Sequence, residues 1–362
     1  MTRVAIAGGG TGGHLFPGLA VAEELARAGM AISWLGARRG LEAIRVPQAG
    51  IPLQLLAVTG ASARSPGAQL CAALRVAPAT LQAAAHLLHQ GVGAVLAVGG
   101  YASLPGAVGA GMLGIPVVLQ EQNALPGLSN RLLAPWCVTV ACGFEAAVSA
   151  FASLPARWTG NPVRAEFFSV PSPPLEPLAV LVIGGSQGSA FLNALLPETL
   201  ARLVQGTPLP RVIHQSGERW EADVRQRYAD IGVAAEVVPF LERPAEAMAR
   251  AALVVARAGA LTLSELAAAR RAALLVPFAA AAGGHQLANA RAYAATGAAE
   301  VLEEREATPG RTAALLAQLL ASPTQLVDRG RAAARLARPD AAREVARLVL
   351  EAARFDGRGG AH

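Results

Sequence analysis

The chain has 362 residues, which predicts two domains at roughly 150 residues each. Apolar residues make up 53% of the chain and charged residues 15%, which excludes an intrinsically disordered protein. The net charge is +6, and arginine is used throughout in place of lysine. We expect no nucleic-acid partner, because the sequence has no basic run and aromatic residues make up 4%.

The cysteines and the apolar segments indicate the cellular compartment and whether the chain crosses a membrane. Three cysteines without a CxxC pair argue against a disulfide framework or a zinc site and favour the cytoplasm. The first residues, MTRVAIAGGG, predict a strand before a glycine turn rather than a signal peptide. Residues 76–120 lack charged side chains, but prolines, glycines and histidines interrupt them. We therefore expect a buried α/β core there, since a spanning helix needs about 20 unbroken apolar residues.

The first half of the chain alternates short apolar runs with helical segments. A glycine turn at 8–13 and a helix over 17–29 follow the first run. Runs this short and this apolar predict strands that are buried on both faces of a parallel sheet. The predicted strands cover residues 3–7, 31–35, 52–56, 94–98, 115–119 and 138–142.

The pattern restarts after TGNPVR (159–164) and a proline-rich stretch over 169–177, which favours a spacer between domains. A second glycine turn, GGSQGS (184–189), precedes a helix, and a last amphipathic helix is expected over 340–354. The predicted strands here cover 178–184, 211–215, 235–240, 252–256 and 273–278. We predict an α/β fold of two tandem, Rossmann-like, doubly wound parallel-sheet domains, residues 1–163 and 164–339, with a cleft between them.

Three glycine-containing turns follow a predicted strand and open a helix: GGGTGGH (8–14), GGSQGS (184–189) and ARAGALTLSE (256–265). Glycines let backbone N–H groups approach an anion, and a helix N-terminus adds about half a positive charge. Turns of this kind in both domains favour a ligand that carries phosphates. The alternative is that the glycines serve tight packing between helix and strand.

The spacing Gly8-x-Gly10-x-x-Gly13 matches the dinucleotide-binding fingerprint. That fingerprint also needs an acid after the second strand to hold a ribose, and here Gly36, Ala37, Arg38 and Arg39 follow. NAD is therefore disfavoured, whereas the arginine pair leaves NADP open.

His14 and Glu265 are the candidate chemical groups beside these turns. A neutral imidazole next to a phosphate-type turn suits a general base near pH 7; the alternative for His14 is a capping or packing role. Glu265, early in a predicted helix, suits a bidentate acceptor for two vicinal ribose hydroxyls, or it complements the helix dipole.

Several of these motifs occur in the order and spacing of one known family. GGGTGGHLFPGLAVAEEL, GGYASLPGAVGAGMLGIPVVLQEQNALPGLSNRLLA, TGNPVR, GGSQGS, ARAGALTLSE and GHQLANA resemble the MurG-type N-acetylglucosaminyltransferases of bacterial peptidoglycan synthesis. The similarity extends from Arg3 to about Ala353.

The resemblance implies a GT-B glycosyltransferase that transfers GlcNAc from UDP-GlcNAc to the C4 hydroxyl of MurNAc in lipid I, with inversion. It implies no cofactor and no metal, which agrees with the lack of an Asp-x-Asp motif. It further implies that a helix over 340–355 returns to the first domain, and that the enzyme is peripheral on the cytoplasmic face of the inner membrane.

The resemblance also assigns site residues by position. It makes His14 the base that takes the acceptor proton, and Glu265 the ribose contact. Leu241 corresponds to the residue whose backbone reads the uracil edge, and Gly99, Gly100 and Tyr101 belong to a turn that faces the acceptor. The remaining donor-side residues it implies are Thr11, Gly12, Gly13, Asn123, Arg164, Ser186, Ala260, Leu261, Thr262, Leu263, Ser264 and Gln286.

The chain departs from the family pattern at three positions. Gln120 stands where the family usually has histidine before Glu-Gln-Asn, and glutamine cannot exchange a proton near pH 7. Gly284 replaces the usual aspartate before His-Gln, and Ala256 replaces a serine.

The segment 67–88 suits either a membrane-docking patch or ordinary core. Its apolar residues lie near Arg64 and Arg75 and are Leu70, Leu74, Val76, Leu81, Leu87 and Leu88.

Three other functions stay open at this point. Another GT-B enzyme, such as a glycolipid synthase or a sugar-nucleotide epimerase, would share the donor site. An NADP-dependent oxidoreductase would use the first glycine turn but would leave the second turn and Glu265 unexplained. A non-catalytic UDP-sugar-binding protein would account for Gln120 and Gly284.

Overall fold

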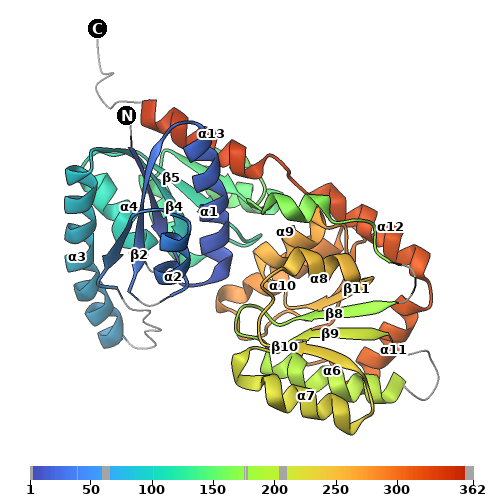
Figure 1. The fold of residues 1–362 in the computed structure, drawn as a ribbon. Coiled ribbons are helices and arrows are strands. Elements are labelled where there is room, and N and C mark those ends of the chain that lie inside the picture. Colours follow the sequence, from blue (N-terminus) through green and yellow to red (C-terminus); the bar gives the residue numbers. More distant parts are fainter. Residues whose placement is uncertain are drawn as a thin grey trace. The chain divides into compact units, whose positions relative to one another are not determined.

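The computed structural model describes residues 3–38, 40–58, 66–100, 102–174, 176, 178–203 and 210–354. The chain divides into two compact units, Met1–Arg164 with Arg338–His362 and Ala165–Ala337 (Figure 1). Each unit is a parallel sheet with helices on both faces, so the predicted class of two doubly wound α/β domains is confirmed.

The first unit holds a seven-stranded sheet in the order β3-β2-β1-β4-β5-β6-β7. Alternate residues of its central strands face opposite helical layers, as Val4 and Ala5 of β1 illustrate. The strands are β1 (Arg3–Gly8), β2 (Ala31–Ala37), β3 (Leu53–Leu56), β4 (Val92–Gly99), β5 (Val117–Glu121), β6 (Thr139–Cys142) and β7 (Ala156–Trp158).

Helices cover both faces of this sheet (Figure 1). On one face lie α3 (Pro66–His89), α4 (Ser103–Met112), α5 (Leu128–Leu133) and the 3₁₀ turn η1 (Ala134–Trp136). On the other face lie α1 (Gly12–Arg27), α2 (Glu42–Gln48) and α13 (Ala341–Arg354). A further 3₁₀ segment, η2 (Glu145–Phe151), packs beside β6 and β7.

The last helix, α13, joins the core of the first unit. Val345, Leu348, Val349 and Ala352 are all buried, in one cluster with α1 and the central strands. The apolar face predicted for this helix is therefore confirmed, and its burial ties the end of the chain to the unit in which the chain begins.

Helix α1 begins five residues earlier than the sequence predicted. Thr11 is its N-cap, in an extended conformation, so Gly12 opens the helix and Pro17 lies inside it. Placing the start at Pro17 was wrong because proline favours a first turn but does not exclude an earlier cap. The predicted end is confirmed: Gly29 has a φ of 78°, and the N–H of Met30 bonds to the carbonyl of Leu25 as in a Schellman cap.

The second unit holds a six-stranded sheet in the order β10-β9-β8-β11-β12-β13. Its strands are β8 (Ala179–Ile183), β9 (Arg211–Gln215), β10 (Ala235–Val238), β11 (Leu253–Ala256), β12 (Ala272–Leu275) and β13 (Ala299–Val301). The two edge strands β7 and β13 were not predicted, because three residues each give too short an apolar run to be recognised.

Two helical layers also flank this sheet (Figure 1). The helices are α6 (Ala190–Leu203), α7 (Glu221–Asp230), α8 (Pro244–Arg250), α9 (Ala260–Ala268), α10 (His285–Ala294), α11 (Pro309–Leu320) and α12 (Pro323–Ala333). The 3₁₀ turns are η3 (Ala165–Ser169), η4 (Glu218–Trp220), η5 (Ala282–Gly284) and η6 (Ala334–Leu336). Leu192, Val224 and Leu316 represent the core on the side of α6, α7 and α11.

The proline-rich stretch belongs to the second unit and is held there by arginine. The buried guanidinium of Arg271 donates to the carbonyls of Met248, Ala269 and Pro171 at 2.7, 2.7 and 2.8 Å. Arg270 donates to the carbonyl of Val170. The described part of this stretch is thus packed within the second unit, where the sequence favoured a spacer between domains. A composition rich in proline does not reveal bonds from residues 100 positions away.

A buried polar network joins β9 to α6 and α7. His214 is fully buried, with Nδ1 2.8 Å from the hydroxyl of Tyr228 and Nε2 3.0 Å from Oδ1 of Asn193. Burial lowers the pKa of His214 to about 3 and raises the pKa of Tyr228. His214 is therefore neutral at neutral and mildly acidic pH.

This network predicts acid-sensitive stability. The unfolded chain protonates its histidines near pH 6.5, whereas folded His214 stays neutral down to about pH 3. The unfolded state thus binds the extra proton, and the free energy of unfolding falls by about 1.4 kcal/mol for each pH unit below 6.5. We expect the advantage of the wild type over His214→Gln, measured by urea unfolding, to be smaller at pH 5 than at pH 7 by about 2 kcal/mol. The exposed His89, changed to glutamine, is the control, and an equal difference at the two pH values would contradict the assignment.

Candidate active site

The predicted site residues lie at the carboxyl ends of the strands in each unit. Parallel strands end at a common edge, and the turns that follow them are the usual ligand-binding place in such sheets. In the first unit these turns follow β1, β4 and β5; in the second they follow β8, β10, β11 and β12.

The turn after β1 carries His14 on the first turn of α1. The imidazole Nδ1 lies 3.2 Å from Oγ1 of the exposed Thr11. The ring rests on the backbone of Gly99 at the end of β4, where a Cβ atom would come within 2.7 Å of its Cδ2. Gly12 is buried and Gly13 half-buried between them. Thr11, His14 and Gly99 are thus brought together, although 85 residues of sequence separate His14 from Gly99.

The turns after β1 and β4 also support each other directly. The N–H of Gly9 donates to the carbonyl of Gly99 at 3.2 Å. A Cβ atom at Gly100 would lie 2.0 Å from the carbonyl oxygen of Gly9, so the two backbones are in contact. Gly100 has a φ of 82°, which also favours glycine. Tyr101 lies outside the described residues.

Sequence reasoning missed Glu42, the first residue of α2. Its carboxylate is fully buried and accepts the N–H of Gly10 at 2.7 Å and that of Ala37 at 3.1 Å. Glu42 is an acid shortly after the second strand, and this could have indicated it. It lies beyond residues 36–39, where an acid that holds a ribose was expected. It binds the protein's own turn, and this argues against the dinucleotide interpretation of Gly8-x-Gly10-x-x-Gly13.

A second buried carboxylate, Glu121, organises the turn after β5. One oxygen accepts from the backbone N–H and the side-chain amide of Asn123 at 2.8 and 3.0 Å. The other accepts from the N–H of Gly127 at 3.0 Å and the amide of Asn130 at 2.9 Å. Asn123, a predicted sugar contact, is therefore held in place by the acid two residues before it.

Gln120 departs from the family pattern at a buried position. Its side chain is fully buried, and neither atom of its amide has a hydrogen-bond partner within the described part of the chain. Burying an unpaired amide is unfavourable. The substitution from the family's histidine is thus located in the interior beside the turn that carries Asn123.

The electrostatics of His14 favour the neutral ring. Burial lowers the pKa of His14 below its ordinary value of 6.5. The charge of Glu121, a hydrogen bond with the backbone of Gly9 and the charge of Glu42 oppose this effect but do not outweigh it. A neutral imidazole at pH 7 can accept a proton, so the arrangement can act as a general base.

Arg164, the last residue of the first unit's main segment, also reaches α1. Its guanidinium lies over the ring of Phe16, 5.2 Å from the ring centre. The stacking holds the Arg164 cation against Phe16, which follows His14 by two residues in the chain.

In the second unit, the turn after β8 is fixed by β9. Gln215 accepts the N–H of Gly184 at 3.1 Å. Gly188, with a φ of 74°, lies so close to the strand that a Cβ atom would stand 1.8 Å from the carbonyl oxygen of Ser216. Ser186, the predicted diphosphate contact, is exposed at the tip of this turn.

The turn after β11 is anchored by Arg257, another residue that sequence reasoning did not single out. Its Nε donates to Oγ of Ser189 at 3.0 Å, and a second nitrogen donates to the carbonyl of Val276 at 3.0 Å. A third lies 2.5 Å from a carboxylate oxygen of Glu304. Because Ser189 ends the turn after β8, Arg257 joins two of the predicted phosphate-binding turns.

The residues of α9 that are predicted to contact the donor differ in the exposure of their side chains. Thr262, Ser264 and Glu265 are half-buried, whereas Ala260 and Leu261 are buried at the helix start. Leu263 is 1% exposed and faces the core. A contact from Leu263 to a ligand would therefore have to use its backbone. Leu241 is half-buried just after β10.

Gln286, at the start of α10, is bonded to two neighbouring turns. Its Oε1 accepts the N–H of Ala258 at 3.2 Å and that of Phe278 at 2.9 Å. Since the carbonyl oxygen is engaged, the amide NH₂ is the part of Gln286 suited to meet a sugar hydroxyl. Glu304 accepts the N–H of Ala279 in the same loop at 3.2 Å.

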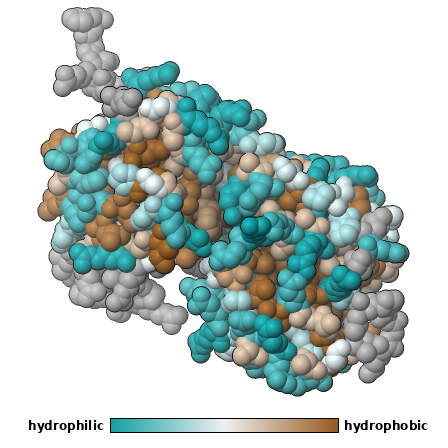
Figure 2. All heavy atoms as spheres, in the orientation of Figure 1, coloured by the Kyte–Doolittle hydropathy of each residue, from teal (hydrophilic) through white to brown (hydrophobic). Residues whose placement is uncertain are grey.

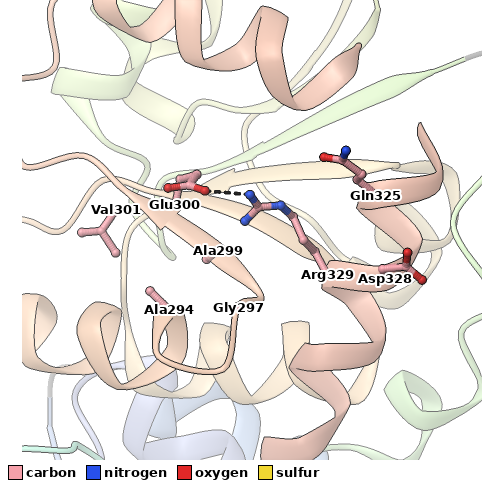
Figure 3. Close-up of a pocket in the computed structure, with 8 residues that line it drawn as sticks. All are labelled: Ala294, Gly297, Ala299, Glu300, Val301, Gln325, Asp328 and Arg329. Atoms are coloured by element: carbon pink, nitrogen blue, oxygen red, sulfur yellow. Dashed lines mark hydrogen bonds and ion pairs between the residues drawn. The ribbon is translucent and has the colours of Figure 1, made fainter. Parts of the chain in front are cut away.

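An open pocket lies away from all of these residues, at the edge strand β13. It is formed by the end of α10, β13 and α12, and its wall includes the ion pair Arg329–Glu300 at 2.7 Å (Figure 3). Ala294 and Gly297, which precede β13, also line it, so it opens near the amino end of this strand. None of the predicted site residues lines this pocket.

Apolar side chains reach the surface of the first unit (Figure 2). The expected patch over residues 67–88 is divided: Leu81 and Leu88 are exposed, Val76 is half-buried, and Leu87 is fully buried because it faces the sheet. The side chains of Leu70, Leu74, Arg64 and Arg75 lie outside the described residues. In a neighbouring set on α4, α5 and η1 every member is exposed: Met112, Leu128, Leu132 and Trp136.

No three histidine, cysteine, aspartate or glutamate side chains in the described ranges come together in a way that could hold a metal ion. Among the described helices, none combines the length and apolar character that crossing a bilayer requires.

Two parallel-sheet units with glycine turns at their carboxyl edges, and a last helix returned to the first unit, define the GT-B fold. Family models agree: the glycosyltransferase family 28 N-terminal domain matches residues 4–142, and the family 28 C-terminal domain matches residues 179–345. The chain belongs to glycosyltransferase family 28 and, within it, to the MurG-type enzymes.

The similar proteins support this placement over the whole length. The UDP-N-acetylglucosamine–N-acetylmuramyl-(pentapeptide) pyrophosphoryl-undecaprenol N-acetylglucosamine transferase of Alkalilimnicola ehrlichii is 44% identical over 97% of this chain and 99% of its own. The enzyme of the same name from Cupriavidus metallidurans is 42% identical over 95% and 96%. The crystal structure of MurG from Acinetobacter baumannii has a TM-score of 0.79, 31% identity, and coverage of 97% and 100%.

A further solved structure shares the fold alone. A putative UDP-N-acetylglucosamine 2-epimerase from Listeria monocytogenes has a TM-score of 0.71 at 10% identity, with coverage of 99% and 98%.

The bonds of Gln286 yield a prediction about stability. Gln286→Glu retains an acceptor for both N–H groups, whereas Gln286→Leu leaves them unpaired at a cost of about 2 kcal/mol. For a unit of this size that loss lowers the melting temperature by roughly 4–8 °C. We expect thermal denaturation to show this drop for Gln286→Leu and a much smaller one for Gln286→Glu. Equal melting temperatures for the two variants would contradict the role of Oε1.

Proposed function

We propose that this chain transfers GlcNAc from UDP-GlcNAc to the C4 hydroxyl of the MurNAc unit of lipid I, and so forms lipid II and UDP in peptidoglycan synthesis. The observation that carries the proposal is the 44% identity to the Alkalilimnicola ehrlichii transferase over nearly the full length of both chains. The arrangement of His14 and of the turns in the second unit supports it.

His14 is the proposed base on the acceptor side. The C4 hydroxyl is a poor nucleophile, so the imidazole takes its proton as the oxygen attacks C1 of GlcNAc and the bond from C1 to UDP breaks. In the tautomer whose Nδ1 donates to Oγ1 of Thr11, the lone pair lies on Nε2, and we propose that this nitrogen receives the proton. The lowered pKa of His14 keeps the ring able to do so at neutral pH.

The second unit is the proposed donor site. The departing UDP gains negative charge on its pyrophosphate, which the turn around Ser186 and the start of α9 at Ala260 to Thr262 would meet with N–H groups and hydroxyls. Glu265 would accept from the ribose hydroxyls, the backbone of Leu241 would read the uracil edge, and the amide of Gln286 would contact the sugar. Residues 164–339 are thus the proposed donor domain, and residues 1–163 the proposed acceptor domain.

The direct test is UDP release from UDP-GlcNAc, with and without a short-chain lipid I analogue. We expect release that depends on the analogue and continues in the presence of a chelator of divalent metals. Saturable donor binding without release would instead support a UDP-sugar-binding protein, and Gln120→His would then show whether the buried glutamine is the reason.

Replacing the proposed base tests the mechanism. We expect His14→Gln to lower kcat roughly 10²- to 10⁴-fold, because the acceptor hydroxyl loses its proton acceptor. Binding of UDP-GlcNAc, measured by calorimetry, is expected to stay close to that of the wild type. A variant that binds the donor normally and keeps full turnover would refute the role of His14.

We further propose that the first unit docks on the cytoplasmic surface of the inner membrane, where lipid I is presented. Leu128, Leu132 and Trp136 are 72%, 67% and 57% exposed along α5 and η1, and the exposed Arg131 lies among them. Apolar side chains with an adjacent cation suit an anionic lipid surface. Met112, 60% exposed at the end of α4, extends the same region.

Vesicle flotation tests this docking surface. We expect Leu128→Asp/Leu132→Asp to reduce binding to anionic vesicles, since two charges oppose insertion of the leucines. The control is Ile44→Asp, because Ile44 is 60% exposed on α2, which packs on the opposite face of the same sheet. Equal binding by the folded double variant and the wild type would exclude this surface.

A further inference from the structure

Glu42 is a buried acid that the proposed reaction does not use. It is fully buried, and its two carboxylate oxygens accept the N–H groups of Gly10 and Ala37 at 2.7 and 3.1 Å. Gly10 is 32 residues away in the chain, so α2 brings the acid beneath the turn after β1. A buried charge is costly unless it is well bonded. Each carboxylate oxygen accepts one of these N–H groups, whereas the amide of a glutamine offers a single acceptor oxygen, so the pair of bonds calls for an acid.

Three glycines make the space for this carboxylate. A Cβ atom at Gly9, Gly36 or Gly40 would come within 2.4, 2.9 or 2.3 Å of Glu42. Gly9 and Gly40 also have φ values of 145° and 154°, where other residues are strained. The turn after β1, the end of β2 and the start of α2 are thus all shaped around one acid.

The turn that Glu42 holds leads directly to His14. Gly10 is followed by Thr11, the cap of α1, whose hydroxyl lies 3.2 Å from the imidazole. On its other side, Gly9 donates to the carbonyl of Gly99, against which the imidazole ring rests. Any shift of Gly10 would therefore move both supports of the ring.

We propose that Glu42 is a positioning residue for the transfer reaction: its carboxylate fixes the Gly8–Gly10 turn and thereby the imidazole of His14. The inference rests on the proposed function, in which His14 is the base. The N–H of Gly10 donates to the carboxylate of Glu42, so this N–H does not serve to bind a phosphate of the substrate.

The charge of Glu42 also acts on the ring that it positions. Burial lowers the pKa of His14, while Glu121 on β5 and Glu42 on α2 are the ionisable groups that raise it. Neutralising Glu42 removes one of these two opposing charges. The pKa of His14 then falls further, and the acid limb of the rate profile moves to lower pH.

The test compares Glu42→Gln with Glu23→Gln, which removes the same charge from an exposed position on α1. In Glu42→Gln the amide NH₂ replaces one carboxylate oxygen. It then faces one of the two backbone N–H groups, donor against donor, so the turn shifts. We expect kcat to fall roughly 10- to 100-fold while KM for UDP-GlcNAc stays nearly unchanged. The acid limb of the kcat profile is expected at lower pH in Glu42→Gln, with the control variant like the wild type. A kcat and an acid limb equal to those of the wild type would overturn the proposal.

A second readout does not depend on turnover. NMR titration of the His14 imidazole, assigned with His14→Gln, is expected to give a lower pKa in Glu42→Gln than in the wild type. If the wild type transfers no sugar, the proposed function fails, while this titration still tests the link between Glu42 and His14; an unchanged His14 pKa would refute it.

If Glu42→Gln does not fold, Glu42→Asp keeps the charge but shortens its reach, and we expect a lower kcat with an acid limb like that of the wild type. Wild-type kcat in a folded Glu42→Asp would also refute the proposal.

Discussion

Backbone N–H groups in the turns at the carboxyl edges of the two sheets have to be paired, and glycines bring no side chain to pair them. Side chains from neighbouring elements accept these hydrogens instead: Glu42 for Gly10, Glu121 for Gly127, and Gln215 for Gly184. Gln286 does the same for two turns of the second unit. Because an unpaired buried N–H is costly, this requirement fixes the shape of each turn from outside it.

This way of holding the turns suits the chemistry proposed for the chain. A transferase without a metal relies on groups that are already in place when charge develops, since reorganisation during the reaction would raise the barrier. Arg257, in the turn after β11, donates to Ser189, which ends the turn after β8, so the two turns proposed to meet the diphosphate are one connected structure. In the first unit, the two buried acids hold the supports of His14 and Asn123 and also oppose the effect of burial on the His14 ring.

Most of the fold could be predicted from the sequence because buried parallel strands are short, apolar and regularly spaced. The edge strands β7 and β13 were missed, and α1 was started late at Pro17, because their local patterns are weak or misleading. The glycine turns and His14 were recognisable as motifs. Glu42 and Arg257 were not, since their partners lie 32 and 68 residues away and only the folded chain brings them together. The roles of the predicted donor contacts stay predictions.

These bonds imply that the turns at both sheet edges are fixed before any substrate binds. Hydrogen exchange at the amides of Gly10 and Gly127, followed by NMR in the protein without ligands, tests it most directly. We predict that both amides are protected to a degree close to that of the neighbouring strands, and that UDP-GlcNAc changes the exchange of Gly10 little. Rapid exchange at both positions that slows only when substrates are added would show that ligands order the turns, and would contradict the account.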